Sequence, residues 1–311
     1  MSLGSLTLEY SIRSMVKPYL RRVPLNARGV RRLRTLAETA FSFLKPPMST
    51  VYLQQTVIAG VRVEEITPRS SVIKGTLLYC PGGGYLCCSP KTHRNLTVRL
   101  ASLCRLRLIV LDYTKVPEGE PLDALVQAID VYKHVLKNYV RGATASHPIF
   151  FAGDSAGGHL ALTATLEAHR LGLPIPRGLV CLSPWTDMSC PQEGRFYDSW
   201  DPLIPITTLE QVAKRCLHGA SPYDERFSPV YANLACLPPM LVQAVANEVL
   251  YHDSTRLVAR AQEAGVAAHL SSWLNVPHCF QLLAPYMSQA VAALDEIEYF
   301  VSYHIHHGLQ H

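Results

Sequence analysis

Long apolar runs are missing from the sequence, and with them the simplest signal of a membrane protein. The apolar run Leu108–Leu111 is far shorter than the roughly 20 residues that a spanning helix needs. Residues 1–20 contain no sustained apolar stretch and no small-residue cleavage site, so no signal peptide is predicted. We therefore expect a cytoplasmic protein with no stable insertion into a membrane.

Paired cysteine motifs are also absent, although the chain contains nine cysteines. Cys87 and Cys88 are adjacent and the others are scattered, so no CxxC pair occurs. An odd number of cysteines in a long chain argues against a disulfide framework and against a zinc site. We expect reduced, mostly buried thiols, and we expect no metal and no other cofactor.

Charged residues are few, at 17% against 48% hydrophobic residues, which excludes a disordered chain. Residues 1–50 hold nine Lys and Arg against two Glu, so the net charge of +5 originates in this segment. Basic and apolar residues alternate there: Arg28, Arg31, Arg32 and Arg34 with Val30, Leu33, Leu36 and Ala37. The spacing predicts an amphipathic helix with a solvated basic face. We assign this face no partner and expect no nucleic-acid binding; a surface for anionic lipid or nucleic acid is the alternative.

The pattern along the chain divides it into two parts. Residues 1–50 are predicted to be helical and to end at Pro46-Pro47, and strand and helix patterns alternate from residue 51 onward. The predicted strands are 61–67, 75–80, 107–112, 148–152, 178–183, 240–245 and 268–273. The predicted helices are 92–104, 121–138, 157–171, 253–264 and 282–303. This alternation predicts an α/β fold, with a mostly parallel central sheet flanked by helices. Residues 185–237 show one helical pattern, near 207–217, and are predicted to lie over the carboxyl edge of the sheet.

A G-x-S-x-G pattern occupies Gly153–Gly157, between an apolar strand and a helix rich in Ala and Leu. A sharp strand-to-helix turn crowds its neighbours, and glycine at both flanks removes side chains that would clash. Such a turn raises the hydroxyl of Ser155 above the sheet and aims the backbone N–H of Ala156 at a developing oxyanion. We predict that Ser155 is a nucleophile and Asp154 is structural; an ordinary glycine turn is the alternative.

A second glycine cluster, Pro81–Gly84, follows the predicted strand 75–80. Consecutive glycines let a backbone approach a substrate closely and point N–H groups at it. The cluster lacks the G-K-[ST] ending of a phosphate loop, which excludes that interpretation. The next residues, Tyr85 and Leu86 together with Cys87 and Cys88, either line a substrate pocket or belong to the core.

A serine hydroxyl needs a base within hydrogen-bond reach and a carboxylate that orients this base. In chains with this serine turn the order is Ser, then Asp or Glu, then His. His278 lies in a loop between the last predicted strand and the last predicted helix, where the base is expected. Glu248 directly follows a strand, and we favour it as the acid. Asp253 is the alternative acid, although it is better placed to cap the next helix.

Motifs of one known family occur in order along the chain: 81–84, Tyr113 with Pro117-Glu118, 153–158, Ser183–Asp187, Asp201–Leu203, Phe227–Val230 and Leu237–Met240. This order resembles the hormone-sensitive-lipase-like branch of α/β-hydrolases, the bacterial family IV esterases, over residues 51–303. The resemblance implies a catalytic triad of Ser155, Glu248 and His278. It also implies an oxyanion hole made by the backbone N–H groups of Gly83, Gly84 and Ala156.

Two positions depart from the family pattern. The histidine that precedes the glycines in the family is Pro81 here, and proline cannot donate a hydrogen bond that supports the loop. The acid is usually Asp in the family, with Glu in some members, and here Glu248 stands at that position.

The resemblance also implies a domain organisation and an activity. Residues 51–311 would form the hydrolase domain, and residues 1–50 with part of 185–237 would form a helical cap. We expect a serine carboxylesterase that hydrolyses short- to medium-chain acyl esters as a monomer or homodimer. An amidase or lactonase with the same triad is one alternative. A non-catalytic small-molecule-binding protein is another, as in plant hormone receptors that resemble these esterases and lack the catalytic histidine, which His278 retains here.

Overall fold

A single eight-stranded sheet forms the centre of the molecule, with strand order β1-β2-β4-β3-β5-β6-β7-β8. The computed structural model describes residues 10–70, 72–139 and 147–307. The strands are β1 (Val51–Ile58), β2 (Val61–Pro68), β3 (Gly75–Cys80), β4 (Leu106–Asp112), β5 (Ile149–Asp154), β6 (Gly178–Leu182), β7 (Met240–Val245) and β8 (Ala268–Trp273). Strands β1 and β2 pair antiparallel, β2 is antiparallel to β4, and all later neighbours are parallel. The predicted α/β fold with a mostly parallel sheet is confirmed.

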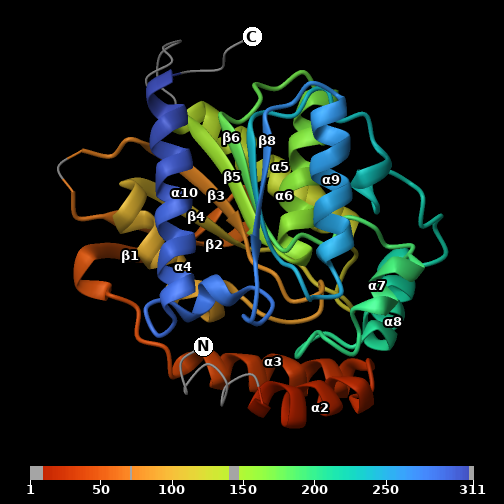
Figure 1. Cartoon of the computed structure of the whole chain (residues 1–311). Coiled ribbons are helices and arrows are strands. Elements are labelled where there is room, and N and C mark those ends of the chain that lie inside the picture. Colours follow the sequence, from red (N-terminus) through yellow and green to blue (C-terminus); the bar gives the residue numbers. More distant parts are fainter. Residues whose placement is uncertain (1–9, 71, 140–146, 308–311) are drawn as a thin grey trace.

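Helices cover both faces of this sheet (Figure 1). They are α2 (Lys17–Arg22), α3 (Ala27–Ser42), α4 (Pro90–Cys104), α5 (Pro121–Asn138), α6 (Ala156–Arg170), α7 (Gln192–Phe196), α8 (Ile206–Leu217), α9 (Tyr251–Glu263) and α10 (Ser288–His307), with a π-helical turn at Ile12–Val16 and 3-10 turns at Met48–Thr50, Pro229–Tyr231 and Phe280–Leu283. One apolar core lies under α5, α6 and α9, and a second lies under α4 and α10. Strands β3, β5 and β7 are buried along their whole length because side chains of both cores pack against them.

The structure corrects several predicted boundaries. Strand β1 was not predicted, because polar and exposed residues such as Gln54 and Gln55 interrupt its apolar pattern at the sheet edge. Helix α10 begins at Ser288 rather than at residue 282, since Phe280–Leu283 form a separate 3-10 turn. In residues 185–237 a short helix, α7, precedes the expected one, so the prediction of a single helix there was incomplete.

Helices α2 and α3 form a separate layer below the ends of the strands (Figure 1). Asn26 starts α3, because its side chain accepts a hydrogen bond from the backbone N–H of Gly29 at 3.0 Å. Val30 faces the core of the protein, as the amphipathic pattern predicted. Two other side chains contradict that pattern: Leu36 is 51% exposed, and Arg34 points inward. The basic face is therefore interrupted by an exposed leucine.

In the part of the chain that the structure describes, every helix is too short or too polar to cross a bilayer.

Candidate active site

Ser155 lies at the turn between β5 and α6 with backbone angles of φ 52° and ψ −122°, a conformation that costs free energy for any residue except glycine. The flanking glycines make this turn possible. A Cβ atom on Gly153 would lie 2.2 Å from the carbonyl oxygen of Gly157, and one on Gly157 would lie 1.9 Å from that of Cys80. The turn is held by the N–H of Ser155, which donates to the Leu182 carbonyl at 2.8 Å. The strained turn thus leaves the side chain of Ser155 partly exposed among buried neighbours.

His278 and Glu248 are in direct contact, as the sequence predicted for a base and its acid. Nδ1 of His278 lies 2.6 Å from Oε2 of Glu248, and both side chains are buried. The other carboxylate oxygen, Oε1, accepts the N–H of Val245 at 3.0 Å, which fixes the carboxylate directly after β7. Nε2 of His278 has no hydrogen-bond partner among the described residues. The imidazole is therefore oriented by one nitrogen while the other remains available.

Acidic groups surround this imidazole. Burial alone would lower the pKa of His278, but the charge and hydrogen bond of Glu248 outweigh burial and raise the pKa above its usual value. Asp201 and Asp154 act on it in the same direction. Asp201 is itself buried beside Glu248, and burial and that neighbouring charge raise its pKa.

The glycine loop after β3 is held on both sides despite its proline. The hydroxyl of Tyr113 donates to the carbonyl of Pro81 at 2.6 Å, and the N–H of Gly82 donates to Oδ1 of Asp154 at 3.0 Å. Gly83 and Gly84 then take left-handed conformations, with φ of 108° and 62°. Within residues 10–70, 72–139 and 147–307, no group accepts a hydrogen bond from the N–H of Gly83 or Gly84. These amides are available to a ligand.

Asp154 is placed for a structural role, as its position suggested. Besides Gly82 it accepts the hydroxyl of Tyr79 at 2.7 Å, and Nε2 of His93 lies 3.0 Å from Oδ1. Burial opposes both charges, but the two groups stabilise each other, so the pKa of Asp154 is lowered and that of His93 is raised. Sequence reasoning missed His93. Its one signal is its place in the first turn of α4, just after the glycine loop.

Tyr85 and Leu86, for which the sequence left a pocket wall and the core as alternatives, are both buried. The hydroxyl of Tyr85 lies 2.7 Å from Nδ1 of His159, whose Nε2 lies 3.0 Å from the carbonyl of Phe227. Burial lowers the pKa of His159 to about 4, so its ring is neutral near pH 7. The Tyr85 hydroxyl therefore donates to Nδ1, and Nε2–H donates to Phe227.

Cys87 and Cys88 remain partly exposed, and they are free thiols like the other cysteines. The thiol of Cys87 donates to the carbonyl of Gly83 at 3.4 Å. This carbonyl also accepts hydrogen bonds from the N–H groups of Leu86 and Cys87, so hydrogen bonds within the turn stabilise its shape.

Sequence reasoning assigned Arg34 to a solvated face, and this assignment was wrong. Its Nε donates to the carbonyl of Leu86 at 2.8 Å, and its Nη2 donates to the carbonyl of Val116 at 3.0 Å. The guanidinium also forms a two-pronged ion pair with Glu118 at 2.7 and 2.8 Å. Arg34 thus joins α3 to the turn that follows the glycine loop.

Asp253, the alternative acid, lies elsewhere. Its Oδ2 accepts the N–H groups of Thr186 at 2.6 Å and Asp187 at 2.9 Å. It does not cap α9 either, because that helix begins at Tyr251 after Leu250. Burial and the neighbouring charge of Asp187 raise the pKa of Asp253 to about 8. The structure therefore pairs His278 with Glu248 and not with Asp253.

A metal is not suggested by these contacts, since the described residues contain no group of three or more His, Cys, Asp or Glu that could hold one.

Comparison with known proteins agrees with this geometry. A family described as alpha/beta hydrolase fold matches residues 77–282. An esterase of Acinetobacter venetianus is 32% identical over 261 residues, which cover 83% of this chain and 84% of that protein. An acetyl-hydrolase of Streptomyces hygroscopicus is 31% identical over a match that covers 71% of this chain and 73% of that protein. The crystal structure of an esterase from the bacterial hormone-sensitive lipase family has a TM-score of 0.89 and 30% identity, covering 98% of this chain and 99% of that one. The chain therefore belongs to the α/β-hydrolase family, in its hormone-sensitive-lipase branch, and is a carboxylic-ester hydrolase.

Proposed function

We propose that the chain hydrolyses short- to medium-chain acyl esters through a Ser155–His278–Glu248 triad and an acyl-enzyme. The observation that carries this proposal is the contact of His278 with Glu248, which leaves Nε2 without a partner among the described residues. A histidine held through Nδ1–H by a carboxylate has its lone pair on Nε2, as a general base requires.

The first step is the attack of Ser155 Oγ on the ester carbonyl carbon, while Nε2 of His278 takes the hydroxyl proton. Negative charge then develops on the carbonyl oxygen, and the N–H groups of Gly83, Gly84 and Ala156 stabilise it. The imidazolium next gives its proton to the leaving alcohol, and the ester bond to the alcohol breaks. Water repeats the sequence on the acyl-enzyme, which releases the acid and restores Ser155.

Pro81 does not disrupt this arrangement. The support that the family obtains from a histidine side chain is supplied here by Tyr113 on one side of the loop and Asp154 on the other. The carboxylate of Asp154 is in turn fixed by Tyr79 and His93. The first two residues of the glycine loop, Pro81 and Gly82, are therefore both held by hydrogen bonds.

Cap helix α8 supports the limit on acyl length. A Cβ atom on Gly84 would lie 3.7 Å from Cγ1 of Val212, so α8 packs directly above the glycine loop. The acyl chain of a substrate bound to these amides meets this helix. We propose that residues 1–50 and part of 185–237 act as the cap, and that it restricts the pocket to short and medium chains. The name of the Streptomyces relative, an acetyl-hydrolase, agrees with a small acyl group.

The test is hydrolysis of p-nitrophenyl esters from acetate to palmitate by the wild type and Ser155→Ala. We expect turnover that falls from butyrate to palmitate and a Ser155→Ala rate at background. The matched control is Ser302→Ala, a serine on α10 whose hydroxyl donates to Glu298, and this variant should keep wild-type turnover. Absence of turnover on every ester would contradict the proposal, and cleavage of amides or lactones instead would support the alternative substrates.

A cytoplasmic location and a monomeric or dimeric state remain predictions. Cell fractionation of the source organism and light scattering of the purified protein check them.

A further inference from the structure

Some basic residues of the N-terminal helices have partners in the rest of the protein, and others have none among the described residues. Lys17 donates to the carbonyl of Asp201 at 2.7 Å, Arg21 pairs with Asp198, and Arg34 pairs with Glu118. In contrast, the side chains of three arginines of α3 make no hydrogen bond or ion pair with any described residue: Arg28, Arg31 and Arg32. All three are exposed. Their charges are therefore not used to hold the fold.

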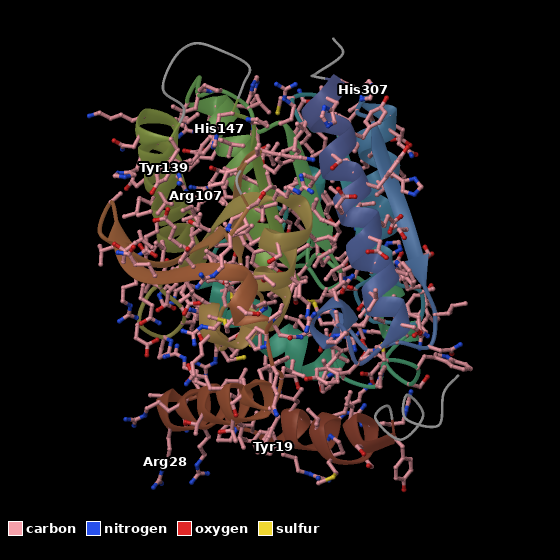
Figure 2. All side chains as sticks on the ribbon, turned by 90° about the vertical axis from the view of Figure 1, so that its left-hand side faces the viewer. Tyr19, Arg28, Arg107, Tyr139, His147 and His307 are labelled. Carbon is pink, nitrogen blue, oxygen red and sulfur yellow. The ribbon has the colours of Figure 1, made fainter. Side chains whose placement is uncertain are left out.

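These arginines border one hollow on the outer side of the helical layer. The hollow has a volume of about 510 Å³ and is lined by Tyr19, Arg28, Arg31, Arg32, Thr35 and Leu36. We call these six residues the cap face. Figure 2 shows Arg28 pointing away from the sheet domain, with Tyr19 in the same layer of helices. The cap face contains no acidic residue, so its field is positive throughout.

Apolar side chains are exposed in the same segment. Leu36, within the cap face, is 51% exposed, and the exposed residues Met15 and Phe43 lie on the flanking parts of the N-terminal segment. Isolated exposed apolar residues are ordinary, but an apolar residue among unpaired arginines is typical of a helix that lies at a lipid interface. A nucleic-acid surface would use the same arginines and gain nothing from an exposed leucine or methionine.

We propose that the cap face binds the anionic headgroups of a lipid surface, so that the protein docks peripherally on negatively charged membranes. The guanidinium groups of Arg28, Arg31 and Arg32 contact lipid phosphates, and Leu36 enters the interfacial region. Guanidinium groups match phosphate oxygens in a two-pronged geometry. The helices lie on the lipid and do not cross it.

Docking in this way orients the site. The helical layer lies below the ends of the strands, the edge of the sheet that also carries Ser155 after β5 (Figure 1). The catalytic edge of the sheet then faces the lipid, and esters dissolved in the interface reach it over a short distance. This consequence rests on the proposed function, whereas the docking itself does not.

The experiment is flotation of the full chain with vesicles of phosphatidylcholine, with and without phosphatidylglycerol. We expect binding to the vesicles that contain phosphatidylglycerol and its reversal at high salt, because surface charges are screened. The triple variant Arg28→Gln/Arg31→Gln/Arg32→Gln should lower the partition coefficient roughly a hundredfold, at roughly fivefold for each arginine near an anionic surface. The control Lys133→Gln/Lys137→Gln/Arg170→Gln removes equal charge from α5 and α6 and should bind nearly as wild type.

A single variant, Leu36→Ser, keeps the test valid if the triple variant fails to fold, and it should lower binding roughly fivefold. Ser155→Ala should bind vesicles as wild type, so failure of the docking proposal and failure of the esterase proposal are distinguishable. Hydrolysis of soluble p-nitrophenyl butyrate should be unchanged in the triple variant. Equal binding to neutral vesicles, equal loss in the control triple, or duplex DNA that displaces the vesicles would overturn the proposal.

Discussion

At the scale of single residues, the two nitrogens of His278 have different environments. Glu248 holds Nδ1 at 2.6 Å, and Nε2 is left unpartnered in the described part of the chain. The sequence predicted both residues from their place after a strand and in a late loop. The motif Asp201–Leu203 was recognised in the sequence, but its burial beside these two residues was not predicted, because the motif lies far from both of them in the chain.

Replacing Glu248 by Gln tests the orientation of the imidazole. An amide can donate to Nδ1 and so favours the wrong tautomer, and we expect kcat to fall by roughly 10³- to 10⁴-fold. Glu225→Gln changes an exposed carboxylate and should keep wild-type activity. A Glu248→Gln enzyme with a kcat within a few-fold of wild type would exclude Glu248 as the acid.

The pH profile of the wild type gives a second expectation for His278. The base acts only when neutral, and its pKa is raised, so kcat/KM should fall with acid at a pH above the ordinary value for histidine. In Glu248→Gln the main group that favours the imidazolium is gone, so the acid limb should move to lower pH. Steady-state rates from pH 5 to 9 locate the acid limb in the wild type and in Glu248→Gln. An acid limb at the same pH in both enzymes contradicts this assignment.

Tyr85→Phe separates the two interpretations of Tyr85. The change leaves the buried Nδ1 of His159 without a donor, and we expect the free energy of unfolding to fall by about 1–3 kcal/mol. The kcat/KM of the folded variant should stay near wild type. Tyr223→Phe is the control, since Tyr223 is 64% exposed. A large loss of kcat/KM without loss of stability would instead place Tyr85 in the pocket wall.

At the scale of elements, the turn after β3 is the part whose shape matters most. It is anchored by the end of β5 through Asp154, by the segment after β4 through Tyr113, and by α3 through Arg34. None of these three anchors is adjacent to the glycines in the sequence. The glycine cluster itself was recognisable from the sequence, but its anchors became visible only when distant elements were brought together.

Gly83→Ala tests the shape of this turn. A Cβ atom there would lie 2.3 Å from the carbonyl oxygen of Cys87, and the backbone φ of 108° is unfavourable for alanine. The turn must shift and misalign the oxyanion amides, so we expect kcat to fall roughly a hundredfold. Gly60→Ala is the matched control, because its φ is also positive, at 82°, but nothing lies within 4 Å. Similar rates in the two variants would show that these amides do not act in the reaction.

At the scale of the whole molecule, side chains of the N-terminal helices tie this layer to the rest of the protein at several points. Arg34 binds the turn after the glycine loop, and Lys17 binds the backbone of the segment before α8. Burial lowers the pKa of Lys17, but its donors are directed at carbonyl and carboxylate oxygens of that segment. The helical layer is therefore bound to both sides of the site.

Asp253 should make the free energy of unfolding decrease as the pH rises. Its pKa is about 8 in the folded state against 3.8 as the ordinary value, so the folded state binds more protons between these two values. The contribution of Asp253 to the free energy of unfolding is therefore greatest below the lower value. It decreases as the pH rises toward the higher value, by at most about 1.4 kcal/mol per pH unit. Asp253→Asn removes this titration. Urea unfolding at pH 5, 7 and 9 measures the free energy of unfolding of both proteins. The value for the variant should increase relative to that of the wild type as the pH rises. A difference that stays constant with pH contradicts the assignment.

Local pattern in the chain was enough to predict the fold class and the serine turn, because these depend on periodicity and on glycines at fixed spacing. Strand β1 was not predicted, since an edge strand with exposed polar residues has no clear apolar pattern. The folded molecule was needed to show how a glycine loop without its histidine is supported, which of the arginines in α3 holds the fold, and which of them stay free. Those outcomes depend on contacts between residues far apart in the chain, such as Arg34 with Leu86 and Asp154 with His93, and local pattern carries no information about such contacts.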